Sequence, residues 1–403
     1  MFVENSYPND PRVKNECDVL KGAGHVITVV ALRRKGQEPA EMVEGVQVYR
    51  IPRLELFQKL PSENPGFFER VQIKLKSVIG YASEYVYFTM ACFFMSFYVA
   101  AKRGFDVIHA HNPPDTLFVV ALVHKLFGKK YVFDHHDLCP ELYRSRFGAK
   151  ADLVSRILQW VEWGNLKLAD ITIATNESYK SIHMQRGRRK PEKVFVVRNG
   201  PNQKRMQIVA PSTRLRSLNK TILCYIGSLN PQDGVDYLLR SLKHLRYDLK
   251  REDFYCVVIG SGDSLDDLKK LAQTLRLEGC VELTGYISDT ELQEYLSAAD
   301  ICVDPDPSSP LNDVSTWIKV MEYMAYGKPI VSFDLKETRF SAQDAALFVP
   351  CNDEMAFAEG IARLMDDPSM RLRMGRYGRE RVERDLQWSV VSRNLLSAYE
   401  ALN

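Results

Sequence analysis

The sequence has no closely spaced cysteine pairs and no large excess of either charge. Its eight cysteines are scattered through 403 residues without a CxxC spacing, which argues against a structural zinc site and favours a reducing, cytoplasmic compartment. Lys and Arg number 54 against 51 Asp and Glu, and a net charge of +3 is far from the basic excess typical of nucleic-acid-binding proteins. We therefore expect neither zinc nor nucleic acid as a partner.

Long apolar segments and repeats are also scarce. The chain is long enough for two or three domains, and it shows no tandem repeat. Polar residues follow directly after residues 1–3, so we expect no signal peptide. The longest uncharged run, 85–101, is shorter than the ~20 apolar residues of a spanning helix. Two interpretations stay open: a buried core helix, or a helix that rests on a membrane surface together with Arg70, Lys74 and Lys76.

Short apolar runs alternate with helix-length segments along nearly the whole chain. This alternation predicts a parallel α/β architecture, because parallel strands are buried on both faces. Two series of five strands predict two doubly wound sheets, and the polar stretch 203–220 predicts the boundary between them. The expected strands lie at 26–32, 106–110, 131–137, 171–175 and 194–199, then at 222–228, 254–262, 280–286, 301–305 and 329–334.

Ligands of open α/β sheets bind beyond the carboxyl ends of the strands, so the residues that follow each strand are candidates. Three strands of the second series end in glycines, which permit close approach of a ligand to the backbone. Each pattern is also typical of an ordinary tight turn. These candidates are Gly227 with Ser228, Gly260 with Gly262, and Gly285 with Tyr286.

The segment 312–329 carries the strongest chemical signal. Its apolar residues recur at helical spacing, and Asn312 or Asp313 is expected to cap the helix. The free amides of a capped first turn then favour a phosphate.

One face of this expected helix is polar. Ser315, Lys319 and Glu322 recur there at i, i+4 and i+7. Lys319 would add a positive charge for a phosphate, and the carboxylate of Glu322 would accept hydrogen bonds from a ribose diol. The structural alternative is a surface pair between Lys319 and Glu322.

With these motifs in view, the sequence resembles the retaining glycosyltransferases of family 4, whose GT-B fold has two Rossmann-like domains facing a cleft. The resemblance implies an acceptor-binding domain at 1–200, a nucleotide-sugar-binding domain at 201–384 and a final helix, 385–403, that crosses back to the first domain. It covers nearly the whole chain through YPNDPRVKNE, AGHVITVV, HAHNPPD, DHHD, the NG hinge, YIGSL, DGVDYLL and KVMEYMAYGKPIV.

The resemblance assigns Glu322 to the second glutamate of the family's E-x7-E signature, which holds the ribose. The first glutamate falls at Val314. Asp313, or the amides of Ser315 and Thr316, are the expected substitutes near the transferred sugar.

The family's usual diphosphate clamp of an arginine and a lysine is replaced by Ser228 and Asp233. A departing diphosphate needs its charge neutralised, so Lys319 is the expected replacement. Arg198 and Arg12 are reserve candidates from the first domain.

His136 and Asp137 match the family's H-D motif, in which the histidine lies against the donor sugar. His135 competes for that role, because adjacent residues point in opposite directions. On the acceptor side the candidates are Asp10, Arg12, Asn15 and Asp137, with Asp115 and Glu141 as weaker ones, and a structural role is expected for His109, His111 and His124, which lack acidic partners at metal-ligand spacing.

The expected reaction is transfer of a hexose from a nucleotide sugar, with UDP as the nucleotide, to a glycan or lipid-linked acceptor in surface polysaccharide synthesis. His136, Asp313 and Lys319 are the expected catalytic residues, and no metal or other cofactor is expected, even at the DxD match 304–306. The alternatives are a nucleotide-sugar epimerase and a non-catalytic sugar-nucleotide-binding partner of a membrane assembly. We expect a cytoplasmic protein, with contact to the inner face of the cell membrane as an added interpretation.

Overall fold

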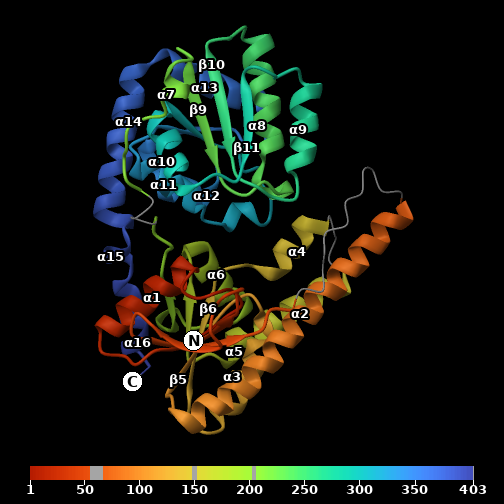
Figure 1. Cartoon of the computed structure of the whole chain (residues 1–403), viewed down its shortest axis with the longest axis vertical. Coiled ribbons are helices and arrows are strands. Elements are labelled where there is room, and N and C mark those ends of the chain that lie inside the picture. The colour runs from red at the N-terminus through yellow and green to blue at the C-terminus, as the bar shows by residue number, and fades with distance from the viewer. Residues whose placement is uncertain (55–66, 148–151, 202–205, 403) are drawn as a thin grey trace. The chain divides into compact units, whose positions relative to one another are not determined.

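The structure, a computed structural model, describes residues 1–54, 67–147, 152–201 and 206–402, without the side chains of 67–75, 77 and 78. Its internal contacts divide the chain into two units (Figure 1). Unit 1 comprises Met1–Arg198 and Ser392–Asn403, and unit 2 comprises Asn199–Val391. Each unit is built on one sheet with helices on both faces.

The sheet of unit 1 has eight strands in the order β3-β4-β2-β1-β5-β6-β7-β8. All neighbours are parallel except β3 and β4, which form an antiparallel hairpin at the edge. The strands are β1 (Phe2–Val3), β2 (Thr28–Leu32), β3 (Ala40–Val43), β4 (Val46–Ile51), β5 (Val107–His111), β6 (Lys130–His135), β7 (Ile171–Ala174) and β8 (Val194–Val196).

The helices of unit 1 bury apolar stripes against this sheet. Phe88 of α2, Val120 of α3 and Leu166 of α5 belong to one hydrophobic cluster with the strands. The last helix, α16, returns to unit 1, where Asn394 donates a hydrogen bond to the carbonyl of Val196 at 2.8 Å. The helices are α1 (Pro11–Gly22), α2 (Phe67–Lys102), α3 (Phe118–Lys125), α4 (Cys139–Phe147), α5 (Leu153–Leu168), α6 (Glu177–Arg186) and α16 (Arg393–Glu400).

The sheet of unit 2 has six parallel strands in the order β11-β10-β9-β12-β13-β14. They are β9 (Thr221–Ile226), β10 (Phe254–Ile259), β11 (Val281–Gly285), β12 (Ile301–Asp304), β13 (Ile330–Phe333) and β14 (Ala346–Val349). The helices are α7 (Thr213–Arg216), α8 (Val235–Lys243), α9 (Leu265–Thr274), α10 (Asp289–Ala298), α11 (Ile318–Ala325), α12 (Lys336–Ala342), α13 (Glu354–Asp366), α14 (Pro368–Arg381) and α15 (Trp388–Val391).

The predicted α/β class is confirmed, and all ten expected strands are present within a few residues of their predicted bounds. Sequence reasoning missed β1, β14 and the hairpin of β3 and β4. The hairpin had a readable signal, because Glu44 and Gly45 join its strands with φ of 49° and 82°, and such turns favour glycine at the second position. β1 has only two residues, too few for a periodicity.

The predicted helix start at Asn312 or Asp313 is wrong. These residues form one turn of 3-10 helix, Ser315 is extended, and α11 begins at Ile318 without a side-chain cap. Asn312 is used elsewhere, since its side-chain amide donates hydrogen bonds to the carbonyls of Gln232 and Pro307 at 2.8 and 2.9 Å. The expected i, i+4, i+7 face therefore does not exist.

Candidate functional site

The loops after β9 and β10 in unit 2 pack tightly on one another. A Cβ on Gly260 would lie 1.8 Å from the carbonyl oxygen of Gly227, and a Cβ on Gly262 would lie 2.5 Å from that of Leu229. These glycines are required for packing between the loops, as the tight-turn interpretation implied. Their predicted role in donor binding stays a prediction.

The third glycine pattern lies in the open. Gly285 has a φ of 73° and no atom within 4 Å of the position of a Cβ. Tyr286 is 84% exposed, and Ser228 is exposed as well. Side chains with this exposure are available to a ligand.

Lys319 is a buried charged residue of unit 2. It lies in the first turn of α11 and is 8% exposed. Its ammonium forms ion pairs with two fully buried carboxylates: that of Asp304, the last residue of β12, at 3.4 Å, and that of Asp306 in the loop that follows. The ammonium also lies over the rings of Tyr225 and Trp317, 4.8 and 5.3 Å from their centres. We call these five residues the Lys319 cluster.

The charge of Lys319 follows from these neighbours. Burial lowers the pKa of a lysine, but the nearby carboxylates outweigh it and hold the pKa of Lys319 well above its usual value. Lys319 is therefore a buried cation, which is at odds with the alternative of an exposed surface lysine. Sequence reasoning noticed Asp304 and Asp306 as a DxD match but did not foresee that Lys319 lies between them.

The other predicted donor residues are placed around the start of α11. Ser315 is buried, and its hydroxyl donates a hydrogen bond to the carbonyl of Leu311 at 2.7 Å. Thr316 and Asp313 are partly buried. Glu322 is partly buried and lies one helical turn after Lys319.

A second cluster of titratable groups lies in unit 1, where β5 and β6 end. His136 Nε2 and His111 Nδ1 lie within hydrogen-bonding distance of the Asp134 carboxylate, at 2.8 and 3.0 Å. Asn112 fixes the loop, because its side-chain oxygen accepts hydrogen bonds from the backbone N–H groups of His136 and Asp137. His136 Nδ1 is buried and has no hydrogen-bond partner.

The cluster extends toward the last helix. His109 stacks on His111 with ring centres 4.3 Å apart, and its Nδ1 lies 2.9 Å from the hydroxyl of Tyr399. Glu16 on α1 lies 3.8 Å from both imidazoles. Burial raises the pKa of Glu16 well above its usual value, and the nearby carboxylate of Asp134 adds to this.

Four members of this cluster offer atoms that could ligate a metal. Glu16, His111, Asp134 and His136 each provide one such atom, all within 4.8 Å of one another. The sequence-based argument that His109 and His111 lack acidic partners is wrong, because folding brings Glu16 and Asp134 to them. His124 instead lies 2.7 Å from the hydroxyl of Ser96, as a structural role implies.

The two adjacent histidines point in opposite directions, as expected. His135 is fully buried and its Nδ1 lies 2.9 Å from His183 Nε2. Burial lowers the pKa of His135 to about 3, so it is a neutral core residue. Of the two, His136 lies beside Asp134 and remains the candidate.

The acceptor-side candidates Asp10, Arg12 and Asn15 lie at the start of α1. Asp10 is the N-cap, as the capping interpretation implied, and it accepts two hydrogen bonds from the guanidinium of Arg12 at 3.2 and 3.0 Å. Although burial opposes ionisation, Arg12 holds the pKa of Asp10 below its usual range. Asn15 and Asp137 are partly buried.

The weaker candidates serve buried contacts. Glu141 pairs with Arg186 at 2.6 Å, and Arg198, a reserve candidate, is 7% exposed. Asp115 is 4% exposed and accepts a hydrogen bond from the side chain of Asn112 at 2.9 Å.

Asp115 predicts a pH dependence of stability. Burial raises its pKa to about 7, whereas the unfolded value is about 3.9. The folded state therefore holds a proton that the unfolded state has lost, and stability falls as pH rises from about 4 to about 7. We expect Asp115→Asn to remove this loss, making the free energy of unfolding less dependent on pH by about 1.4 kcal/mol per pH unit. Urea denaturation between pH 4.5 and 8 measures it.

The matched control is Asp106→Asn, since the side chain of Asp106 is 99% exposed. Parallel stability curves for Asp115→Asn and the native chain would contradict the assignment.

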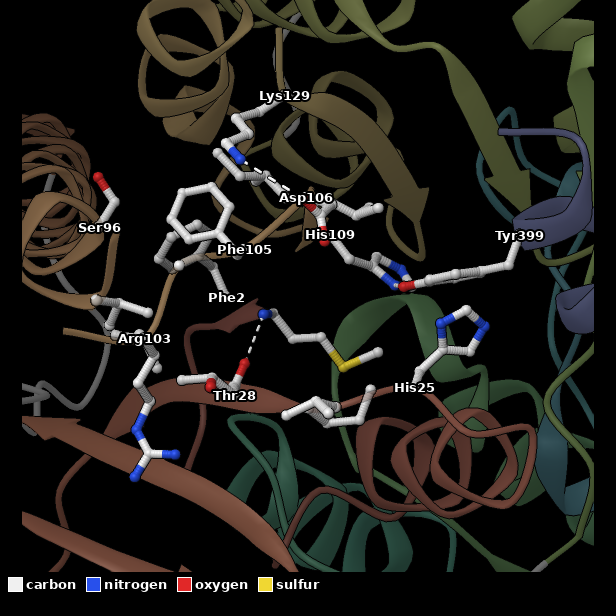
Figure 2. A pocket seen from close by; sticks show the side chains of 18 of the residues that line it. Phe2, His25, Thr28, Ser96, Arg103, Phe105, Asp106, His109, Lys129 and Tyr399 are labelled. Carbon is white, nitrogen blue, oxygen red and sulfur yellow. Dashed lines mark hydrogen bonds and ion pairs between the residues drawn. The ribbon is translucent and has the colours of Figure 1, made fainter. Parts of the chain in front are cut away.

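A cavity of about 750 Å³ also lies in unit 1 (Figure 2). Phe2 of β1 pairs with Val30 of β2 and with Ala110 of β5. If β1 were extended toward the N-terminus in this register, its added residues would lie between Thr28 and Ile108, which line the cavity. The cavity therefore lies between β2 and β5, where residues added before Met1 would continue β1.

An engineered extension tests this interpretation. Placing Lys-Ile-Val-Val before Met1 is expected to raise the free energy of unfolding by about 2–4 kcal/mol, because apolar side chains fill the cavity. Denaturant melts measure the gain. The extension Lys-Gly-Ser-Gly is the control. Equal stability of the two extended proteins would show that the added residues do not continue β1 between β2 and β5.

Comparison with known proteins identifies the class. Residues 12–205 match the family described as Glycosyltransferase Family 4, and residues 212–381 match the family described as Glycosyl transferases group 1. The two matches cover the two units in turn, so the chain belongs to the family 4 (group 1) glycosyltransferases, and its fold is the GT-B fold.

Individual relatives agree with this family. Over 158 residues the chain is 27% identical to an alpha-D-kanosaminyltransferase of Streptomyces kanamyceticus, covering 39% of each chain. Over 128 residues it is 31% identical to the lipopolysaccharide core biosynthesis glycosyltransferase LpsE of Rhizobium meliloti, covering 31% of this chain and 36% of LpsE. The matches thus span little more than a third of these relatives.

A solved structure matches almost the whole chain. HepE of Anabaena in complex with UDP-glucose superposes with a TM-score of 0.70 and 15% identity, covering 99% of this chain and 98% of that one. This similarity supports the fold.

Proposed function

We propose that the protein transfers a hexose from a nucleotide sugar to a hydroxyl of a glycan or lipid-linked acceptor, with retention of configuration. The observation that carries the proposal is the buried cation of the Lys319 cluster at the carboxyl end of the unit 2 sheet. Such a position is where parallel α/β sheets bind ligands. UDP is the proposed nucleotide because the similar HepE structure holds UDP-glucose. Surface polysaccharide synthesis is the proposed setting, since LpsE is named for lipopolysaccharide core biosynthesis.

Unit 2 is proposed to hold the nucleotide. The free amides at the start of α11 and the Lys319 ammonium face the diphosphate, and they neutralise its charge as the sugar leaves. Lys319 thereby replaces the family's arginine and lysine, whose positions hold Ser228 and Asp233. Glu322, one turn further along α11, accepts hydrogen bonds from the ribose.

Unit 1 is proposed to supply His136 to the sugar. The hydrogen bond from Nε2 to Asp134 fixes the ring, which leaves Nδ1 to bond a sugar hydroxyl. The acceptor hydroxyl attacks from the face that the diphosphate leaves, and an oxygen of that diphosphate takes the proton. No protein nucleophile is required.

The reaction is proposed to need no metal. In unit 2 the Lys319 ammonium lies between Asp304 and Asp306, in the position that a metal ion bound to these carboxylates would take. In unit 1 the proposal assigns His136, held by Asp134, to the sugar and not to a metal ion. Undiminished turnover in EDTA is therefore expected.

A reducing compartment is part of the proposal. Six cysteines are buried, at positions 17, 92, 224, 256, 280 and 302. Burial raises the pKa of Cys224 to about 12, which keeps this thiol protonated and unreactive. These buried thiols support the proposal of a cytoplasmic location.

The test is release of UDP from a panel of UDP-sugars with and without glycan and lipid-linked acceptors. Transfer requires UDP release that depends on the acceptor, and the anomeric configuration of the product reports retention. Interconversion of sugars without an acceptor would instead support an epimerase. Binding of UDP-sugars with no turnover on any acceptor would support a non-catalytic binding role.

A further inference from the structure

Three helices on one face of the unit 1 sheet present apolar side chains to solvent. The helices are α2, α3 and α5, and their inner faces share one hydrophobic cluster with the sheet. A helix that is apolar on both sides is typical of burial or of contact with a membrane. The outward sides of these helices therefore need a partner of their own.

The outward side of α2 carries more exposed apolar side chains than that of α3 or of α5. Val86, Met90 and Phe94 are 57%, 49% and 65% exposed, and their spacing of four residues keeps them on one side of the helix. Within Ile79–Lys102, an 18-residue window has a mean hydropathy of 1.2, enough for a spanning helix, and 28% of that window is buried. Spanning is incompatible with its inner side, because Phe88 and Cys92 are packed into the core.

The same surface continues over α3 and α5. Leu122 on α3 is 46% exposed, and Ile157 and Trp160 on α5 are 52% and 63% exposed. Phe97 of α2 lies 4.9 Å from the ring of His124 at the end of α3. Trp160 of α5 packs edge-on against Phe118 of α3 at 6.3 Å. These ring contacts join the three helices, and we call their outward sides the apolar face of unit 1.

The exposed charges on the three helices are positive over the ranges 79–102, 118–125 and 153–168. Within 79–102, 118–125 and 153–168 the acidic residues are Glu84, partly buried, and Glu162, fully buried and paired with Arg186. Exposed cations are present there, namely Lys102, Arg156 and Lys167.

The surroundings add further cations. Lys76 is exposed on α2, whereas the side chains of Arg70 and Lys74, which sequence analysis grouped with it, lie outside the described residues. Beyond the helix ends, Asp106 and Asp170 are paired with lysines. Asp152, the N-cap of α5, is partly buried and accepts hydrogen bonds from the Tyr143 hydroxyl and from the backbone N–H of Ser155.

We propose that the apolar face of unit 1 docks onto the interface of an anionic lipid bilayer. Apolar side chains enter the boundary between headgroups and acyl chains, while the surrounding cations contact lipid phosphates. Exposed tryptophan suits this position, because its ring is apolar and its N–H reaches water. The protein lies on the membrane and does not cross it. This inference stands apart from the proposed transfer reaction and can fail without it.

Vesicle co-sedimentation of the full chain tests the inference. With vesicles of phosphatidylcholine and phosphatidylglycerol at 7:3, the protein is expected to partition at least tenfold better than with phosphatidylcholine alone. The variant Phe94→Glu/Trp160→Glu is expected to lose at least tenfold in partition coefficient. Leu372→Glu is the matched control, because Leu372 is 66% exposed on α14 in unit 2, and it should partition like the native protein.

Circular dichroism and Tm establish that the variants fold, and Trp160→Ser alone serves if the double variant does not. Unchanged partitioning of the variants would overturn the inference. Equal binding to neutral vesicles would overturn the assignment to anionic lipid. A native dimer that becomes a monomer in Phe94→Glu/Trp160→Glu, with no vesicle binding, would assign the face to a second copy of the chain.

Discussion

Replacing Lys319 by alanine is expected to lower the free energy of unfolding by about 3–5 kcal/mol, because two buried carboxylates lose their cation. Asp304 and Asp306 are fully buried, and Lys319 is 8% exposed, so water replaces the ammonium poorly. Urea denaturation measures the loss. Lys243→Ala, at an exposed lysine of α8, is the control and should change stability little.

The Lys319 cluster also makes a prediction for ligand binding. If Lys319 faces the diphosphate, Asp306 competes with that diphosphate for the ammonium. Asp306→Asn is then expected to raise the affinity for UDP about tenfold, whereas Lys319→Gln should lower it at least tenfold, about 1.4 kcal/mol in each direction. Isothermal titration of UDP into the folded variants measures both. An affinity that is insensitive to both changes would place the diphosphate elsewhere.

Replacing His136 by alanine is expected to lower kcat by at least about 100-fold, because a group that bonds the reacting sugar is lost. The affinity for UDP should stay unchanged, since the nucleotide is proposed to contact unit 2 alone. Acceptor-dependent UDP release measures kcat, and titration with UDP measures binding. This split between turnover and binding separates a role in the reaction from a loss of folding.

Asp134→Asn tests how His136 is held. The Asp134 carboxylate lies 2.8 Å from His136 Nε2 and orients the imidazole. Because Asp134→Asn leaves the imidazole in place, a smaller loss of kcat is expected than for His136→Ala. His25→Ala, at an exposed histidine of unit 1, is the control. Native turnover of His136→Ala would remove the histidine from the mechanism.

The fold was largely readable from the sequence, because buried parallel strands leave continuous apolar runs. The predicted start of α11 is wrong because Asn312, a residue type that caps helices, bonds two loop carbonyls instead. The carbonyl of Gln232 is far away in the sequence, and no spacing pattern points to that of Pro307. The tertiary contacts of Asn312 thus override its local propensity to cap a helix.

The candidate sites were readable in part. His109 and His111 lie at i and i+2 on β5 and so share one side of that strand, and Asp134 and His136 have the same spacing where β6 ends. That signal would have found the unit 1 cluster. The position of Lys319 between Asp304 and Asp306 depends on the path of the loop after β12, which no local spacing reveals.

A crystal structure of the protein with UDP tests the central claim most directly. We expect the diphosphate within hydrogen-bonding distance of the first amides of α11 and of Lys319, with the ribose hydroxyls on Glu322. A nucleotide bound away from α11, with Lys319 still enclosed by Asp304 and Asp306 and Glu322 turned away from the ribose, would contradict it.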